Sequence, residues 1–225
     1  MMRLTKDKLA QRIGFMHILY YRRRGLIAAG AALFVGKALP ARAADDSAAV
    51  TPIQQLVDGL LQVMKAGTST PFAQRFGMLA PVIDRTFDLA AVLEESVGPT
   101  WPTLPPDQQT MLTEAFRRYT VASYVNSFDS FDGTRFVVNP DTRAVGSESV
   151  VQTQIIPKSG DKHELDYVMR QGGAGWRVVD VLADGSISRV AVQRSDFRRL
   201  LARGGPQALA ESLRSKSADL STGSS

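Results

Sequence analysis

The first part of the chain carries apolar residues at helical spacing. Apolar side chains recur every three or four positions between residues 51 and 128, a period that predicts amphipathic helices. The predicted helices span residues 51–67, 71–85, 88–98 and 106–128. Thr51-Pro52 is a typical helix start, and Gly67 is a typical stop. Asp88 is predicted to cap the third helix, and Pro81 to kink or divide the second.

The end of the fourth predicted helix indicates a cavity or a deep core. Its first half has one apolar and one polar face, whereas apolar residues surround the whole axis between Val121 and Phe128. A helix that is apolar on all sides is deeply buried or lines a cavity. Large aromatic side chains are also numerous for a small fold, which favours an apolar cavity. They are Trp101, Phe116, Tyr119, Tyr124, Phe128 and Trp176.

From Gly133 onward the apolar period changes to two, which predicts β-strands. The predicted strands are Arg135–Asn139, Ala144–Ile156, Lys162–Gln171 and Gly175–Ala183. Short turns at Pro140-Asp141, residues 159–161 and residues 172–174 join them, so the sheet is predicted to be antiparallel. Because apolar and polar residues alternate along the third strand, we expect one face of the sheet to meet helices and the other to meet water.

The C-terminal part returns to a helical pattern. One helix is predicted to begin at Ser195 or Asp196 and to end at Gly204-Gly205, and another begins at Pro206. The polar residues 217–225 are predicted to form a disordered tail. Helices, then strands, then helices predict an α+β fold.

Residues 1–43 have the organisation of an export signal. Arg22 to Arg24 precede the apolar run 25–36, and Ala41-Arg42-Ala43 supplies a small-x-small cleavage pattern. This run is too short to span a bilayer, which needs roughly 20 apolar residues. We predict an exported protein whose signal is cleaved near Ala43. The adjacent arginines fit the twin-arginine route, while a Sec signal and an uncleaved anchor are the alternatives.

The predicted signal also accounts for the positive charge of the chain. The net charge is +5, but residues 1–43 hold nine of the 27 Lys and Arg and only one of the 22 Asp and Glu. The remaining 18 basic and 21 acidic residues give a net charge of about −3. The sequence therefore indicates no surface for nucleic acid.

The sequence offers little catalytic or metal-binding chemistry. The absence of Cys excludes thiolate nucleophiles, zinc–thiolate sites and disulfides. We interpret His163 as a surface residue of a strand and the Gly-rich segment 172–175 as a hairpin turn, since it joins two strands. We therefore predict no enzyme activity, no cofactor and no metal site. In an enzyme, Asp166 and Asp180 would be the candidate carboxylates.

Two groups of residues give the chain a family resemblance. The first comprises Phe87-Asp88-Leu89, Val97-Gly98, Trp101, Pro106-Asp107-Gln108-Gln109, Ala115-Phe116 and Tyr119. The second comprises Trp176-x-Val178-x-Asp180-Val181, Gly185, Ile187-Ser188, Arg194 and Phe197, and ends near Leu213 and Lys216. In this order and spacing, residues 71–216 resemble the toluene-tolerance or MlaC-type periplasmic phospholipid-binding proteins. Ser186 and Gln193 depart from the MlaC-type pattern and fit the hopanoid-biosynthesis-associated branch, called HpnM, better.

The resemblance implies both a fold and a function. It implies a small curved antiparallel sheet of four to five strands packed against N- and C-terminal helices, an NTF2-like core that encloses an apolar pocket. Residues 44–216 would then form a single lipid-binding domain of a periplasmic carrier. Such a carrier shuttles hopanoid or phospholipid between the inner and outer membranes. Its partners would be the lipid, an inner-membrane transporter and an outer-membrane acceptor, with transient contact to the membrane surface.

Two alternatives to a carrier stay open. One is a non-carrier accessory factor of an inner-membrane lipid transporter, and the other is an NTF2-like hydrolase or isomerase. Helix and strand phase select the residues that would line a lipid pocket. They are Leu79, Ile83, Phe87, Leu93, Val97, Trp101, Phe116, Tyr119, Tyr124, Tyr167, Met169 and Trp176.

Overall fold

The structure, a computed structural model, describes residues 41–223 with the exception of residues 159 and 161. The predicted export signal therefore lies outside the described residues, apart from its last three, which begin the first described helix. Within the described part of the chain, no helix is both long enough and apolar enough to cross a membrane.

Helices form the first half of the described chain. They are α2 (Ala41–Ala66), α3 (Phe72–Thr86), α4 (Leu89–Val97), a 3-10 helix (Gly98–Thr103) and α5 (Pro106–Ser127). The predicted bounds of α3, α4 and α5 agree with these to within one residue. Asp88 caps α4 as predicted, because its side chain accepts a hydrogen bond from the backbone nitrogen of Ala91 at 3.0 Å.

Pro52 lies inside a helix, contrary to the predicted helix start, and Pro81 lies inside a helix that it was predicted to kink or divide. α2 begins at Ala41 rather than at Thr51, and it contains Pro52. The preceding residues are rich in Ala, the best helix former, and Val50 is buried, so packing extends the helix upstream. Pro81 does not divide α3, which remains one helix with buried residues on both sides of the proline. The packing of this helix outweighs the one backbone hydrogen bond that Pro81 removes.

Five antiparallel strands form one sheet in sequence order. They are β1 (Arg135–Val145), β2 (Glu148–Ile156), β3 (His163–Gly172), β4 (Gly175–Ala183) and β5 (Ile187–Ser188). The predicted turn at Pro140-Asp141 is wrong, since β1 continues through it with a register shift between Val138 and Thr142. Proline is tolerated there because β1 is an edge strand. The β1–β2 turn lies instead at residues 146–147.

The C-terminal helix α6 (Arg189–Thr222) is longer than predicted at both ends. It does not begin at Ser195 or Asp196, because Ser188 caps it and accepts a hydrogen bond from the backbone nitrogen of Ala191 at 3.0 Å. The predicted break is confirmed by non-helical backbone at Gly204 and by Gly205, whose φ is 65°. The predicted disorder of residues 217–225 is wrong as far as Thr222, since this part is helical and Ser217 is buried.

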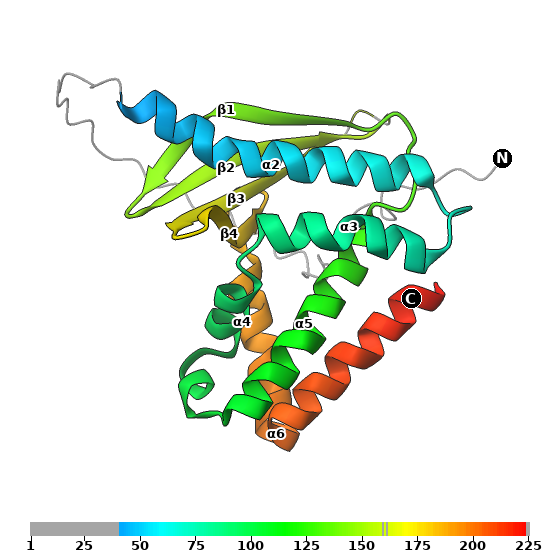
Figure 1. Cartoon of the computed structure of the whole chain (residues 1–225), viewed down its shortest axis with the longest axis vertical. Helices are drawn as coiled ribbons and strands as arrows, with labels where there is room; N and C mark the ends of the chain where they lie inside the picture. Colours follow the sequence, from blue (N-terminus) through cyan, green and yellow to red (C-terminus); the bar gives the residue numbers. More distant parts are fainter. Residues whose placement is uncertain (1–40, 159, 161, 224–225) are drawn as a thin grey trace, which may run out of the picture.

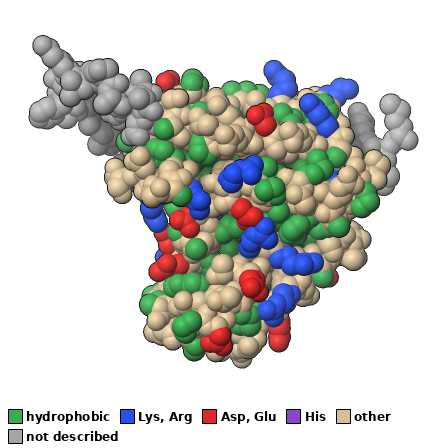
Figure 2. Space-filling model, in the orientation of Figure 1, with side chains coloured by type: hydrophobic (Ala, Val, Ile, Leu, Met, Phe, Trp, Pro, Cys, Tyr) green, Lys and Arg blue, Asp and Glu red, His purple; other side chains and the backbone are tan. Residues whose placement is uncertain are grey.

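The helices cover the sheet in a way that leaves room beside β4. In Figure 1, α2 lies along the sheet, and α5 runs beside α6 below it. The first half of α6 runs away from the sheet, and its second half returns toward α3 (Figure 1). The α+β prediction is thereby confirmed. On the face drawn in Figure 2, Lys and Arg side chains intermix with Asp and Glu.

Candidate functional site

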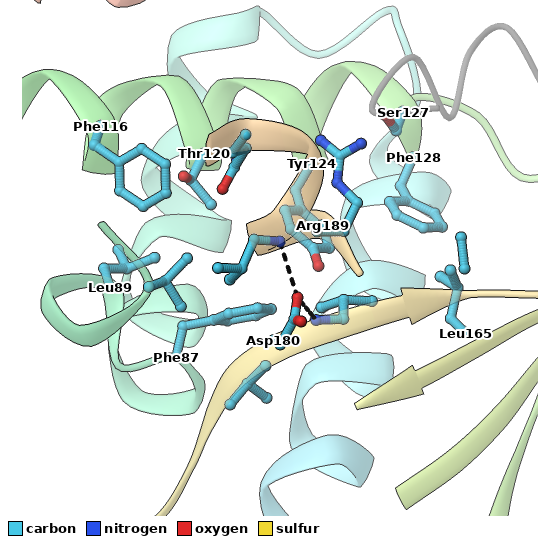
Figure 3. A pocket seen from close by; sticks show the side chains of 16 residues that line it. Phe87, Leu89, Phe116, Thr120, Tyr124, Ser127, Phe128, Leu165, Asp180 and Arg189 are labelled. Carbon is cyan, nitrogen blue, oxygen red and sulfur yellow. Dashed lines mark hydrogen bonds between the residues drawn. The ribbon is translucent and has the colours of Figure 1, made fainter. Parts of the chain in front are cut away.

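A cavity of about 60 Å³ lies between β4 and the helices α4, α5 and α6 (Figure 3). Its wall is mostly apolar and comes from segments far apart in the sequence. The lining residues are Phe87, Leu89, Val92, Phe116, Thr120, Tyr124, Ser127, Phe128, Leu165, Val178, Asp180, Val181, Ala183, Arg189, Val190 and Gln193. A concave apolar site with a few polar groups is the usual form of a small-molecule site.

A bulge in β4 brings two of its valines to the cavity. Val178 pairs with Met169 and Asp180 pairs with Val168, so Val179 is the extra residue. Because of it, Val178 and Val181, three positions apart, both line the cavity, which regular alternation would not allow.

The other face of the sheet is less open to water than expected. Val150, Val168 and Val179 are buried there in a second apolar cluster. Ala91 and Leu182 pack against this cluster. The expectation of a wholly water-facing surface is therefore wrong around β4, because the chain near the start of α4 covers part of that face.

Aromatic rings form one wall of the cavity. Tyr124 on α5 contacts Phe87 edge-on, with ring centroids 5.6 Å apart, and stacks with Phe128 at 6.0 Å. Burial raises the pKa of Tyr124 and of Tyr167, so both phenols are neutral at physiological pH. The Tyr124 and Tyr167 hydroxyls also interact with each other, which links α5 to β3.

Helix α4 closes one side of the cavity through Leu89 and Val92. Three polar contacts hold it in place. Ser96 Oγ donates to Gln193 Oε1 at 3.1 Å, and Arg194 Nε donates to the backbone oxygen of Glu95 at 2.8 Å. Glu95 also pairs with Arg170 of β3 at 2.9 Å. The first two contacts join α4 to α6 and the third joins it to the sheet.

Asp180 ties the end of β4 to the start of α6. One carboxylate oxygen accepts hydrogen bonds from the backbone nitrogens of Val181 at 2.8 Å and Val190 at 3.0 Å (Figure 3). The other accepts from Ser188 Oγ at 2.5 Å. A carboxylate at a helix N-terminus is favoured by the helix dipole. The geometry therefore gives Asp180 a structural role at the cavity wall.

Thr120 and Arg189 are further polar residues of the cavity lining. Thr120 on α5 is only 4% exposed, and its hydroxyl has no hydrogen-bond partner among the described residues. Arg189, the first residue of α6, reaches toward α5 in Figure 3. Burial lowers the pKa of Arg189, and the nearby Tyr119, Tyr124, Asp180 and Asp196 offset this only in part.

Comparison with known proteins places this fold in a family. A family model described as MlaC protein matches residues 54–215, most of the chain. The chain belongs to the MlaC family. The predicted MlaC-type resemblance is thereby confirmed, whereas the HpnM branch stays a prediction. No curated protein matches the chain in sequence.

A solved structure supports the MlaC-type fold. It is described as the phospholipid-binding protein from Ralstonia solanacearum in complex with a phospholipid. The two chains superpose with a TM-score of 0.66 at 21% sequence identity, over 76% of this chain and 98% of that one. At this identity the likeness concerns the fold.

Three of the twelve residues predicted to line a lipid pocket do line the cavity of this MlaC-family chain. Phe87, Phe116 and Tyr124 line it. The others belong to the surrounding core, in which Trp101 and Tyr119 are partly buried. The buried ones are Leu79, Ile83, Leu93, Val97, Tyr167, Met169 and Trp176. The carboxylate of Asp166 is buried but does not line the cavity.

The prediction from helix and strand periodicity missed the polar lining residues Thr120, Arg189 and Gln193, because that periodicity selects apolar positions. A usable signal for Thr120 is its place next to the segment Val121–Phe128, where apolar residues surround the helix axis. For Arg189 no comparable signal exists, since the start of α6 was placed too late. Among the described residues, no group of three His, Cys, Asp or Glu side chains could hold a metal ion.

Proposed function

We propose that this MlaC-family protein is a periplasmic lipid carrier that encloses the apolar part of a phospholipid or hopanoid and shuttles it between the inner and outer membranes. The observation that carries the proposal is the apolar cavity between β4 and helices α4, α5 and α6. The shared fold of the Ralstonia solanacearum protein, which is described in complex with a phospholipid, supports it. The predicted export signal in residues 1–43 supports a periplasmic location.

An apolar enclosure is what transport through water requires. Each methylene moved out of water contributes about 0.8 kcal/mol, so a single acyl chain left in water would cost on the order of 10 kcal/mol. A carrier must bury most of that surface and still release the lipid to a partner. The partners we propose are an inner-membrane transporter and an outer-membrane acceptor, with transient contact to the membrane surface.

The cavity must enlarge before a lipid enters. Its volume of about 60 Å³ holds only a few water molecules, at roughly 10–15 Å³ each, and small-molecule pockets usually exceed about 300 Å³. Helix α4 is the element suited to move. It is short, it lies between the extended Phe87 and the left-handed Gly98, and few polar contacts hold it against α6. Outward movement of α4 would extend the cavity along its apolar wall.

The experiment is extraction of lipid from the protein purified from its native host. Organic solvent extracts analysed by mass spectrometry should contain about one lipid per protein molecule, and the lipid class distinguishes phospholipid from hopanoid. Val181→Trp fills the cavity and should reduce the bound lipid to a small fraction. Val145→Trp is the matched control, since Val145 is 45% exposed on β1 and should keep its lipid.

One result would count against the carrier and another against this cavity as its lipid site. If wild-type protein purified from its native host contained no lipid, the carrier function would lose its support. Equal lipid content in the Val181→Trp and Val145→Trp variants would show that lipid binds somewhere other than this cavity.

A further inference from the structure

An exposed aromatic side chain stands on the α5–β1 loop (residues 129–134). Phe131 is 45% exposed, although Asp129 and Thr134 on either side of it are buried. Asp132 accepts hydrogen bonds from the backbone nitrogen of Thr134 at 3.0 Å and from the Thr134 hydroxyl. Ser130 Oγ donates to the Asp129 carboxylate at 2.9 Å. The loop is therefore held together by its polar residues, and it leaves its one large apolar side chain on the outside.

Two exposed lysines stand beside this loop. The ammonium of Lys65, in the last turn of α2, lies 5.9 Å from the centre of the Phe131 ring. Lys158, in the β2–β3 turn, approaches the loop so closely that a Cβ atom at Gly133 would lie 4.0 Å from Lys158 Cδ. In Figure 1 the end of α2, the start of β1 and the β2–β3 turn all lie at the right-hand end of the sheet. Three separate segments thus bring an aromatic ring and two cations together.

The unpaired charges at this end of the sheet are positive. Among the described residues, no acid forms an ion pair with Lys65, Lys158 or Arg135. Lys162 in the same turn does pair with Glu164, at 3.5 Å. An aromatic ring among cations suits the boundary between headgroups and acyl chains of an anionic bilayer, where the ring enters the boundary and the cations meet lipid phosphates.

The loop also continues directly from the wall of the cavity. Ser127 and Phe128, at the end of α5, line the cavity, and Phe131 follows on the next turn of the chain. Phe128 packs against Phe136 of β1 with ring centroids 6.0 Å apart, so this pair joins the cavity wall to the base of the loop. A bilayer that received Phe131 would therefore lie close to the Ser127–Phe128 end of the cavity.

We propose that the α5–β1 loop docks the protein on anionic phospholipid bilayers, with Phe131 inserted at the headgroup–acyl boundary and Lys65 and Lys158 against lipid phosphates. The proposal rests on the carrier function, and it adds the surface by which the carrier meets a membrane. A lipid surface fits better than a protein partner, because a stable protein interface buries about 800 Å² on each side, far more than one ring and two lysines offer. Contact through so few groups is weak and reversible, as exchange of cargo requires.

The test measures how much purified protein sediments with sucrose-loaded vesicles. One set of vesicles contains phosphatidylcholine alone, and the other contains phosphatidylcholine and phosphatidylglycerol in equal amounts. We expect wild type to bind the mixed vesicles about tenfold more tightly than the phosphatidylcholine vesicles, since each lysine near an anionic surface contributes about 1 kcal/mol. Binding to the mixed vesicles should weaken as the salt concentration rises, because salt screens these charges.

Variants of the ring test its insertion. Phe131→Ser should weaken binding to the mixed vesicles about tenfold, because it removes the apolar surface that enters the bilayer. Val145→Ser is the matched control, since Val145 is also 45% exposed but lies at the end of β1, and it should bind like wild type. Phe131→Trp should bind at least as tightly as wild type, because Trp favours the membrane interface.

Variants of the lysines test the electrostatic part. Lys65→Gln combined with Lys158→Gln should weaken binding to the mixed vesicles about tenfold and leave binding to phosphatidylcholine unchanged. Arg118→Gln combined with Arg198→Gln removes the same charge at exposed positions of α5 and α6. This control should keep most of the binding to the mixed vesicles.

The docking surface is overturned if wild type does not bind the mixed vesicles, or if Phe131→Ser binds them as tightly as Val145→Ser. The lipid content of the same preparations, measured by mass spectrometry, tests the carrier function separately. Protein that contains lipid but binds no vesicles would keep the carrier function and reject the docking surface, leaving Phe131 to a protein partner. Protein that contains no lipid but binds vesicles through Phe131 would reject the carrier function and keep the docking surface.

Discussion

Replacement of Asp180 by Ala should destabilise the protein strongly, because this carboxylate holds the start of α6 over the cavity. Its oxygens accept from the backbone nitrogens of Val181 at 2.8 Å and Val190 at 3.0 Å and from Ser188 Oγ at 2.5 Å. Alanine leaves two backbone donors and a hydroxyl without their acceptor. A buried donor left unpaired costs about 1–3 kcal/mol, and these three donors are part-buried, so we expect a loss of about 3 kcal/mol in total in the free energy of unfolding.

Urea unfolding followed by circular dichroism measures this loss. Asp180→Asn keeps one acceptor oxygen and should lose about half as much as Asp180→Ala. The control is Asp141→Ala at an exposed position of β1, which should change stability by no more than about 0.5 kcal/mol. A loss below about 1 kcal/mol for Asp180→Ala would refute the structural role. A gain in stability would favour the enzyme alternative, since carboxylates kept for catalysis often destabilise the fold.

Three further predictions concern the surrounding structure. Burial raises the pKa of the Asp166 carboxyl, so the folded state binds its proton more tightly than the unfolded state. Stability should therefore fall as pH rises from about 3.9, the ordinary Asp value, through the raised folded value, and urea midpoints of Asp166→Asn should lack this fall. Gly98→Ala should cost about 1–3 kcal/mol in thermal unfolding, because Gly98 has φ 74° and ψ −144°. Phe116→Ala should lower the free energy of unfolding by about 3–5 kcal/mol in urea titrations, because Phe116 is fully buried and packs edge-on against Phe197.

Apolar periodicity predicts elements well where propensity and packing agree. α4 and α5 have their predicted bounds because Asp88, Gly98 and Pro106 act locally, within one turn of a helix end. The same local rules fail at Pro52 and Pro140. There the burial of Val50 and the edge position of β1 decide the outcome, and neither is visible in a local sequence pattern.

The cavity lining is harder to predict than the core. The periodicity of apolar residues identifies buried positions. Of the twelve residues predicted to line the pocket, all but Trp101 and Tyr119 are buried. It does not show which buried side chains border empty space, since that depends on the gap left between whole elements. The bulge at Val179 changes the alternation of β4 as well, so Val181 joins the lining without a sequence signal.

The small size of the cavity fits a carrier that has to release its lipid. An empty apolar cavity costs about 24 cal/mol per Å³, so 300 Å³ of permanent space would cost about 7 kcal/mol. That is comparable to the whole stability of a typical domain, about 5–15 kcal/mol. A cavity of about 60 Å³ costs only about 1.5 kcal/mol on the same scale. A cavity that has to open to take up lipid therefore opposes binding by the cost of opening, and the same cost assists release.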